Sequence, residues 1–337
     1  MTSKTLSTLS EQVIHGTPID LDDARALAAL PDKAPLFQAA DKVRRHCMGN
    51  HFHLCSIINA RSGNCSENCR FCAQSARHHA GVETYTMIEQ GVSMAMAMDN
   101  DQHGVHRLSL VTAGRSLNAK TLSQLTSLYH EIAATTSMAL CASTGMLSPA
   151  IADSLVTAGV SRYHCNLEAN QEYFPKICTT HTWAEKVETL KIASKAGMSL
   201  CSGGIIGMGE SMDDRIVLAM ELREMEIFSI PINILTPIQG TPLEQVQPLD
   251  IEEILTVVAL FRLINPRAVI RMAGGRQQMG LAQYRCFTVG ANGAIVGNYL
   301  TTAGSGMTED LLQLSHLGYT FDHNASHLEL KTAVVEG

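Results

Sequence analysis

From residue 53 onward, short apolar runs alternate with stretches of helical spacing, and this alternation restricts the fold more than any other feature. Helical patterns such as Trp183–Ala196 and Ile251–Ile264 separate the runs. Strands that alternate with helices form parallel sheets. The eight runs predicted to be strands are His53–Ile58, His106–Thr112, Met138–Ala142, Ser161–Leu167, Met198–Ser202, Ser229–Leu235, Ala268–Met272 and Ala294–Val296.

Eight strand–helix units over roughly 250 residues predict an α/β protein with a (β/α)8 TIM-type barrel. A doubly wound open sheet is the second possibility. The first 46 residues instead predict a helical extension, because Leu21–Leu30 and Ala34–Cys47 have apolar residues at helical spacing. We therefore expect an N-terminal helical extension over 1–46, a barrel over 47–321 and a C-terminal tail over 322–337.

Composition excludes several classes of protein. Hydrophobic residues make up 45% of the 337 residues and charged residues 17%, which excludes a disordered chain. The formal net charge is -7, whereas a protein that neutralises nucleic-acid phosphates is usually basic. No stretch has the length and composition of a membrane span, and the first residues lack the apolar run of a signal peptide. We expect a cytoplasmic protein that binds no nucleic acid and no membrane.

The ten cysteines require an explanation, because disulfides do not persist in a reducing cytosol. Cys65, Cys69 and Cys72 follow the first predicted strand closely. A structural zinc site would need a fourth ligand nearby. A redox pair of Cys69 and Cys72 would leave Cys65 without a role. The triplet therefore favours a [4Fe-4S] cluster in which one iron has no protein ligand.

The spacing C-x3-C-x-φ-C, with Phe71 as its aromatic residue, resembles the signature of the radical S-adenosylmethionine superfamily. In that superfamily the open iron binds S-adenosylmethionine, which is cleaved to a 5′-deoxyadenosyl radical. Neighbouring segments resemble the biotin synthase family, in the family's order, from about residue 40 to 320. These segments are 59–65, 72–77, 201–210, 231–235, 240–243, 270–276, 290–292 and 301–302.

This resemblance implies a sulfur-inserting transferase of biotin biosynthesis. Dethiobiotin would be converted to biotin, with sulfur from an auxiliary iron–sulfur cluster inside the barrel. A reducing electron donor such as flavodoxin or ferredoxin and a homodimeric assembly are also implied. Radical chemistry suits such a substrate, because no side chain is basic enough to remove a proton from an unactivated carbon. The alternatives are an enzyme of the same subgroup with another substrate, such as a cofactor maturase, and a non-catalytic iron–sulfur electron carrier.

The resemblance also implies roles at the radical site. The three loop cysteines would hold the [4Fe-4S] cluster and serve catalysis. Phe71 and Ile205 would flank the adenine of S-adenosylmethionine, and Asn166 and Glu168 would contact its ribose. Lys186 replaces an arginine that the family often has, and lysine lacks the bidentate geometry of arginine.

Four residues match substrate contacts of the family. Asn166 and Asn233 would hydrogen-bond the ureido ring, which suits amides because they both donate and accept. Thr301 and Thr302 would lie near the substrate carboxylate. Without the resemblance, capping of strand ends is the simpler interpretation of these side chains.

The auxiliary cluster site departs from the family pattern of three cysteines and an arginine. Cys141, Cys201 and Arg271 match three positions, and Arg271 is accordingly assigned to catalysis. The fourth position holds Ser109, and serine is a poor ligand for soft metals. The retained thiols favour sulfur insertion, whereas the loss at Ser109 favours another substrate.

Two further cysteines offer compensation for this loss. Cys55 lies on the first predicted strand, and Cys47 lies just upstream of it. We expect a four-iron auxiliary cluster, rather than [2Fe-2S], whose ligands are Cys47, Cys55, Cys141 and Cys201. The remaining three cysteines are expected not to be ligands: Cys165, Cys178 and Cys286.

Overall fold

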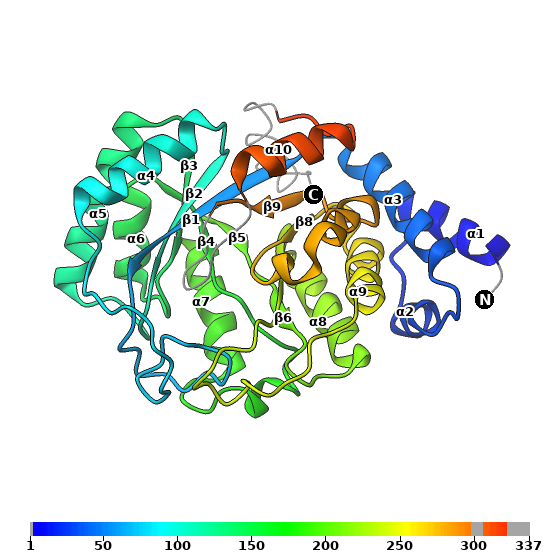
Figure 1. The fold of residues 1–337 in the computed structure, drawn as a ribbon, viewed down its shortest axis with the longest axis horizontal. Helices are drawn as coiled ribbons and strands as arrows, with labels where there is room; N and C mark the ends of the chain where they lie inside the picture. The colour runs from blue at the N-terminus through cyan, green and yellow to red at the C-terminus, as the bar shows by residue number, and fades with distance from the viewer. Residues whose placement is uncertain (1–2, 298–305, 322–337) are drawn as a thin grey trace.

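One curved parallel sheet forms the centre of the molecule (Figure 1). The structure, a computed structural model, describes residues 3–297 and 306–321. Nine strands lie in the order β5-β4-β3-β2-β1-β9-β8-β7-β6, and neighbouring strands pair in parallel. The strands are β1 His53–Arg61, β2 Arg107–Thr112, β3 Ala139–Ser143, β4 Val160–His164, β5 Ser199–Cys201, β6 Gly204–Ile206, β7 Ser229–Ile234, β8 Val269–Met272 and β9 Gly293–Ile295.

The two ends of this order meet and close the barrel. Glu168, which follows β4, donates its N–H to Gly203 O at 3.1 Å and accepts from Ile205 N at 2.9 Å. Ser202 N donates to Ser229 O of β7 at 3.0 Å. β5 and β6 are therefore two halves of one barrel strand, interrupted at 202–203. The (β/α)8 prediction is confirmed, and the eight predicted strands overlap eight of the nine in the structure.

The prediction missed β6, because its run begins with two glycines that leave no side-chain alternation to read. The backbone at this point is tightly packed. A Cβ atom on Gly203 would lie 1.9 Å from Pro231 O, so only glycine fits.

Helices connect the strands and cover the outside of the barrel (Figure 1). Local capping explains several of their starts. α7 begins after Thr182, which forms a capping box with Glu185, and α8 begins after Ser211, which forms one with Asp214. The helices are α4 Gln90–Gln102, α5 Ala119–Thr135, α6 Pro149–Thr157, α7 Trp183–Lys195, α8 Met212–Glu224, α9 Ile251–Ile264, α10 Met307–His316 and the 3₁₀ segments η1 Phe174–Lys176 and η2 Arg276–Thr288.

The N-terminal extension contains three helices, whereas the sequence predicted two. They are α1 Ser3–Ile14, α2 Leu21–Ala28 and α3 Ala34–Met48. The missed helix, α1, buries Leu6, Leu9 and Val13, which are spaced three and four residues apart. α1 packs on α3, α3 packs against α9, and α2 packs against α8 and α9. In the described part of the chain, no helix is long and apolar enough to cross a membrane.

Candidate active site

The inner faces of the barrel strands enclose a cavity of about 350 Å³. Side chains alternate along each strand, so every second residue faces this space. Cys55, Ser109 and Cys141 line it from neighbouring strands β1, β2 and β3, and Ser109 is directly paired with Cys141. Cys201 lines it from β5 and Arg271 from β8. The structure thus brings together three of the four predicted auxiliary thiols and the predicted arginine.

Three arginines line the same cavity, of which the sequence analysis named only Arg271. Arg107, Arg162 and Arg271 are each 5% exposed or less. Buried guanidinium groups are costly unless anions face them. A cluster built from sulfide and thiolate is anionic, so its charge would match this concentration of positive charge. The chemistry of the lining therefore fits an auxiliary iron–sulfur cluster.

Cys201 has a histidine and a serine beside its thiol. His164 Nδ1 lies 3.3 Å from Cys201 Sγ, and Ser229 Oγ donates to this sulfur at 3.3 Å. Arg271 Nη1 in turn donates to Ser229 Oγ at 2.8 Å. Burial raises the pKa of the Cys201 thiol, but His164 and then Arg271 outweigh burial and lower the pKa to about 6. Cys201 is therefore suited to bind metal as a thiolate.

Cys141 and Ser109 differ from Cys201. Burial, and then the charge of Cys201, raise the pKa of Cys141 to about 12. Ser109 Oγ is buried and has no hydrogen-bond partner among the described residues. A buried hydroxyl without a partner is unusual, and this one faces the cavity. A group bound in the cavity would supply its partner.

Cys47 does not lie with the other auxiliary thiols. It occupies the last turn of α3 and does not line the cavity. Burial raises the pKa of its thiol, and the charges of Arg262 and Arg267 partly oppose this rise. Arg262 belongs to α9, on which α3 packs outside the barrel. The structure therefore brings Cys55, Cys141 and Cys201 together at the cavity and separates the fourth predicted ligand, Cys47, from them.

Polar side chains from the loop after β4 line the cavity near the carboxyl ends of the strands. Asn166 and Glu168 line it, and Asn166 Nδ2 donates to Glu168 Oε2 at 3.2 Å. Lys186 is buried, donates to Asn166 O at 2.7 Å and lies 3.7 Å from Glu168 Oε1. Glu168 has a φ of 70°, a left-handed conformation that is rare for glutamate. Lys186 thus positions the polar pair that was predicted to meet the ribose.

The other predicted contact residues occupy the same cavity. Phe71, Ile205 and Asn233 line it. The Asn233 amide donates to Gly204 O at 3.2 Å and accepts from Gly274 N at 3.0 Å, so it also holds β6 near the end of β8. The simpler capping interpretation therefore describes part of its role. Thr301 and Thr302 lie outside the described residues.

Cys65, Cys69 and Cys72 lie on the loop after β1, near the carboxyl ends of the strands. The loop folds back on itself, since Cys65 N donates to Gln74 O at 3.0 Å and Ala76 N donates to Cys65 O at 2.8 Å. Its entry requires Gly63, which has a φ of 72° and whose Cβ would lie 2.4 Å from Thr84 Cγ2. All three thiols are partly exposed, and none of them forms a disulfide. Their number and softness suit an iron–sulfur cluster.

Cys178, which was expected not to be a ligand, lies beside other side chains that can bind metal. Its Sγ lies 3.7 Å from Cys69 Sγ, and His181 lies beside it. The C-x2-H spacing of Cys178 and His181 was the available signal. Cys165 and Cys286, also expected not to be ligands, are buried and pack in the apolar core.

Comparison with known proteins first defines the class. The model of the radical SAM superfamily matches residues 60–222, and that of the biotin and thiamin synthesis associated domain matches 231–320. Methylornithine synthase has the same fold, with a TM-score of 0.80 and 18% identity over 93% of this chain and 96% of that chain. The FeFe-hydrogenase maturase HydG from Carboxydothermus hydrogenoformans has a TM-score of 0.79 and 16% identity, over 94% and 79%. The chain is a radical S-adenosylmethionine enzyme.

Comparison with curated relatives then gives the family. The biotin synthase of Desulfotalea psychrophila is 47% identical, over 94% of this chain and 95% of the relative. That of Acetivibrio thermocellus is 46% identical, over 93% and 98%. The chain belongs to the biotin synthase family.

Proposed function

We propose that this chain converts dethiobiotin to biotin by radical insertion of sulfur. The observation that carries the proposal is the placement of three thiols and three arginines in one cavity below the three-cysteine loop. A radical enzyme that only rearranges its substrate has little need of thiols inside the barrel. As the family resemblance implies, we expect a homodimer and an electron donor such as flavodoxin or ferredoxin.

Two bound groups would supply the reactive species: a [4Fe-4S] cluster with S-adenosylmethionine for the radical, and an auxiliary iron–sulfur cluster for the sulfur. Cys65, Cys69 and Cys72 would hold the first cluster. Glu168, fixed by Lys186, would accept hydrogen bonds from the ribose hydroxyls.

The cavity itself would orient the substrate and exclude water. The amides of Asn166 and Asn233 suit a neutral ureido ring, since an amide both donates and accepts. Apolar residues that line the cavity, such as Ile57, Val111 and Ile205, would help to exclude water from it. Thr301 and Thr302 remain proposed contacts of the substrate carboxylate.

For the auxiliary cluster we propose a four-iron type, with Cys55, Cys141 and Cys201 as ligands and Arg271 beside them. Ser109 in place of a cysteine argues against the familiar [2Fe-2S] arrangement, because a serine hydroxyl binds soft metals poorly. Cys55 supplies a third thiol on the neighbouring strand.

The deciding experiment compares the parent with the Cys65→Ala/Cys69→Ala/Cys72→Ala variant, both purified without oxygen. Iron, acid-labile sulfide and Mössbauer spectra are measured on each. We expect the variant to keep about four irons per chain, held by the auxiliary site. Retention of about two irons would refute the four-iron ligand set, and loss of all iron would refute a sulfur source in the barrel.

Product analysis tests the reaction itself. The reconstituted parent, given S-adenosylmethionine and reductant, should form biotin and 5′-deoxyadenosine from dethiobiotin. Cys201→Ser should retain reductive cleavage of S-adenosylmethionine but form no biotin. Cleavage by the parent with dethiobiotin present but without any biotin would support a different substrate.

A further inference from the structure

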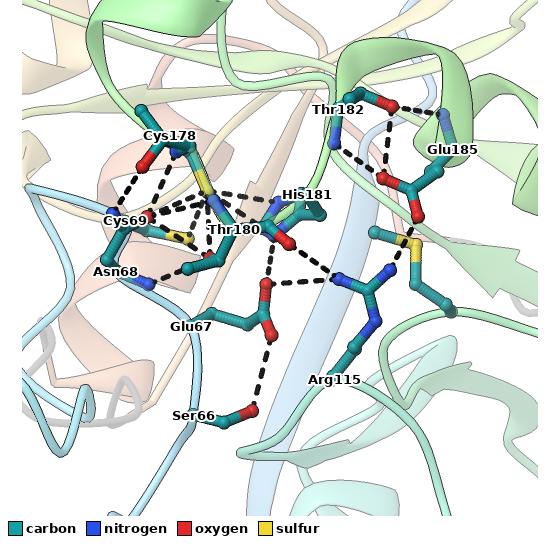
Figure 2. Close-up of polar contacts among 12 residues, drawn as sticks. Ser66, Glu67, Asn68, Cys69, Arg115, Cys178, Thr180, His181, Thr182 and Glu185 are labelled. Atoms are coloured by element: carbon teal, nitrogen blue, oxygen red, sulfur yellow. Dashed lines mark hydrogen bonds and ion pairs between the residues drawn. The ribbon is translucent and has the colours of Figure 1, made fainter.

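A second group of metal-binding side chains lies beside the cysteine loop, outside the barrel cavity (Figure 2). It consists of Cys69, Cys178 and His181, whose ligand atoms all lie within 4.8 Å of one another. Cys178 and His181 are 4% and 7% exposed. Neither residue has a role in the proposed reaction. Two thiols and an imidazole are donors that Zn²⁺ prefers.

The distances match the edges of a tetrahedral zinc site. With Zn–S of about 2.3 Å, two sulfurs of a tetrahedron lie about 3.8 Å apart. Cys69 Sγ and Cys178 Sγ are 3.7 Å apart. With Zn–N of about 2.0 Å, the sulfur-to-nitrogen edge is about 3.5 Å. Cys178 Sγ lies 3.7 Å from His181 Nε2, close to this edge.

The outer contacts orient His181 as zinc-binding histidines usually are. His181 Nδ1 lies 2.5 Å from Glu67 Oε2, so Nδ1–H donates to the carboxylate and Nε2 is left as the metal donor. A carboxylate, a histidine and a metal in this order form a recurrent arrangement that fixes the ring and raises its basicity. Arg115 Nη1, at 3.4 Å from Glu67 Oε2, holds the carboxylate in turn. Figure 2 shows this chain of contacts.

The two loops that supply the ligands are held together independently of any metal. Asn68 Oδ1 accepts hydrogen bonds from Thr179 N at 3.0 Å and from Thr180 N at 3.2 Å. Asn68 N donates to Thr180 Oγ1 at 3.1 Å, and Arg70 N donates to Ile177 O at 2.9 Å. These bonds surround Cys69 and Cys178 on both sides. The two loops are therefore preorganised, so binding needs adjustment of side chains but not of the backbone.

We propose that Cys69, Cys178 and His181 bind one Zn²⁺ ion in the cluster-free protein, with water as the fourth ligand. Binding displaces the two thiol protons and changes no oxidation state. Because Cys69 cannot serve both sites, zinc and the [4Fe-4S] cluster exclude each other. This mutual exclusion of zinc and cluster rests on the proposed role of Cys69 as a cluster ligand. The proposal of a zinc site does not depend on that role.

Cobalt tests the site directly, since Co²⁺ replaces Zn²⁺ and reports thiolate ligands by absorption. The full-length chain, stripped of iron and kept reduced, is titrated with Co²⁺ and then with Zn²⁺. We expect one ion per chain with tetrahedral visible bands and a thiolate-to-cobalt band in the near ultraviolet. Cys178→Ser and His181→Gln should each abolish this spectrum. Glu67→Gln should weaken Zn²⁺ binding about 10–100-fold, as loss of an outer contact does at other sites.

Two controls separate this site from its neighbours. Cys65→Ser should keep the spectrum, because Cys65 belongs only to the cluster loop, and Cys47→Ser should keep it, because Cys47 lies on α3. If Cys65→Ser abolished the spectrum while Cys178→Ser kept it, the ion would belong to the loop cysteines and the proposal would be overturned. Absence of a one-to-one cobalt spectrum in the parent would overturn it as well.

Competition tests the exclusion separately. One equivalent of Zn²⁺ added before reconstitution should block assembly of the [4Fe-4S] cluster in the parent, measured by its EPR signal after reduction. Cys178→Ser should assemble the cluster equally well with and without zinc. If zinc bound at the cobalt site and the cluster still assembled fully, the exclusion would be wrong while the zinc site stood.

Discussion

Individual side chains of β1 and β2 determine which groups the cavity offers to a bound cluster. Cys55 is paired with Arg107, and the next inward pair is Ile57 with Ser109. Cys55 lies one strand and two residues away from Ser109, roughly 8 Å, because adjacent strands are roughly 4.8 Å apart and each residue rises about 3.3 Å along a strand. Both positions face the same cavity. Cys55 can therefore serve the same anionic cluster that a cysteine at the position of Ser109 would serve.

Cys55→Ala should lower the iron and sulfide content of the auxiliary site, with the loop cluster unaffected. Iron analysis and Mössbauer spectra of variants made in the Cys65→Ala/Cys69→Ala/Cys72→Ala background measure this. Cys47→Ala is the matched control and should leave the iron unchanged, since Cys47 lies on α3 outside the cavity. Unchanged iron in Cys55→Ala would exclude Cys55 as a ligand.

Helix α8 contains a carboxyl group whose burial makes stability depend on pH. Burial, and then the charge of Glu224, raise the pKa of Glu221 to about 7 from an ordinary 4.5. Glu221 Oε1 accepts from Gln171 N at 3.1 Å, and Oε2 is buried without a partner among the described residues. The pKa of Glu221 is higher in the folded than in the unfolded chain, so protonated Glu221 favours the folded state. This contribution to stability is fully present below pH 4.5 and is lost as pH rises through about 7.

Glu221→Gln keeps the acceptor and removes the charge. The variant should unfold like the parent near pH 4.5 and be more stable by about 1 kcal/mol above pH 7, a value reduced for partial solvent screening. Urea unfolding at both pH values measures this. Glu224→Gln is the control and should retain most of the parent's pH dependence. If the free energies of unfolding of Glu221→Gln and the parent differed by the same amount at both pH values, burial of the Glu221 charge would not be the cause.

Segment η2 and helix α10 are joined by a buried ion pair. Arg276 and Asp310 are each 1% exposed, and Arg276 Nη1 donates to Asp310 Oδ1 at 3.0 Å. Tyr284 Oη donates to the same oxygen at 2.9 Å. Removal of one charge leaves the other in the interior without its counter-ion, which costs far more than the pair contributes.

Asp310→Asn should therefore lower the free energy of unfolding by about 3–5 kcal/mol. The double variant Arg276→Met/Asp310→Leu should recover most of that loss, since neither charge remains. Chemical denaturation of the three proteins measures both effects. Equal losses in the single and double variants would show that packing, rather than the unpaired charge, is responsible.

At the scale of the whole molecule, metal binding should stabilise the barrel. The proposed cluster ligands come from several strands and loops, which are close together only in the folded chain. A group that binds only the folded state shifts the unfolding equilibrium towards that state.

The anaerobically reconstituted protein should melt about 5 °C or more above the iron-chelated protein. In Cys65→Ala/Cys69→Ala/Cys72→Ala the difference should shrink, because only the auxiliary site remains. Differential scanning calorimetry measures the melting temperatures. Equal temperatures for the reconstituted and chelated parent would mean that the unfolded chain binds the metal equally well.

The sequence alone determined the barrel and most of the strands, because alternation and helical spacing are local properties of the chain. It also predicted the loop triplet, because Cys65, Cys69 and Cys72 lie within eight residues of one another along the chain. Tertiary structure decided what depends on distant packing. Cys47 lies near Cys55 in sequence but outside the barrel, whereas Cys178 meets Cys69 across 109 residues. Arg107 and Arg162 were overlooked because their burial becomes visible only when the strands close around a common cavity.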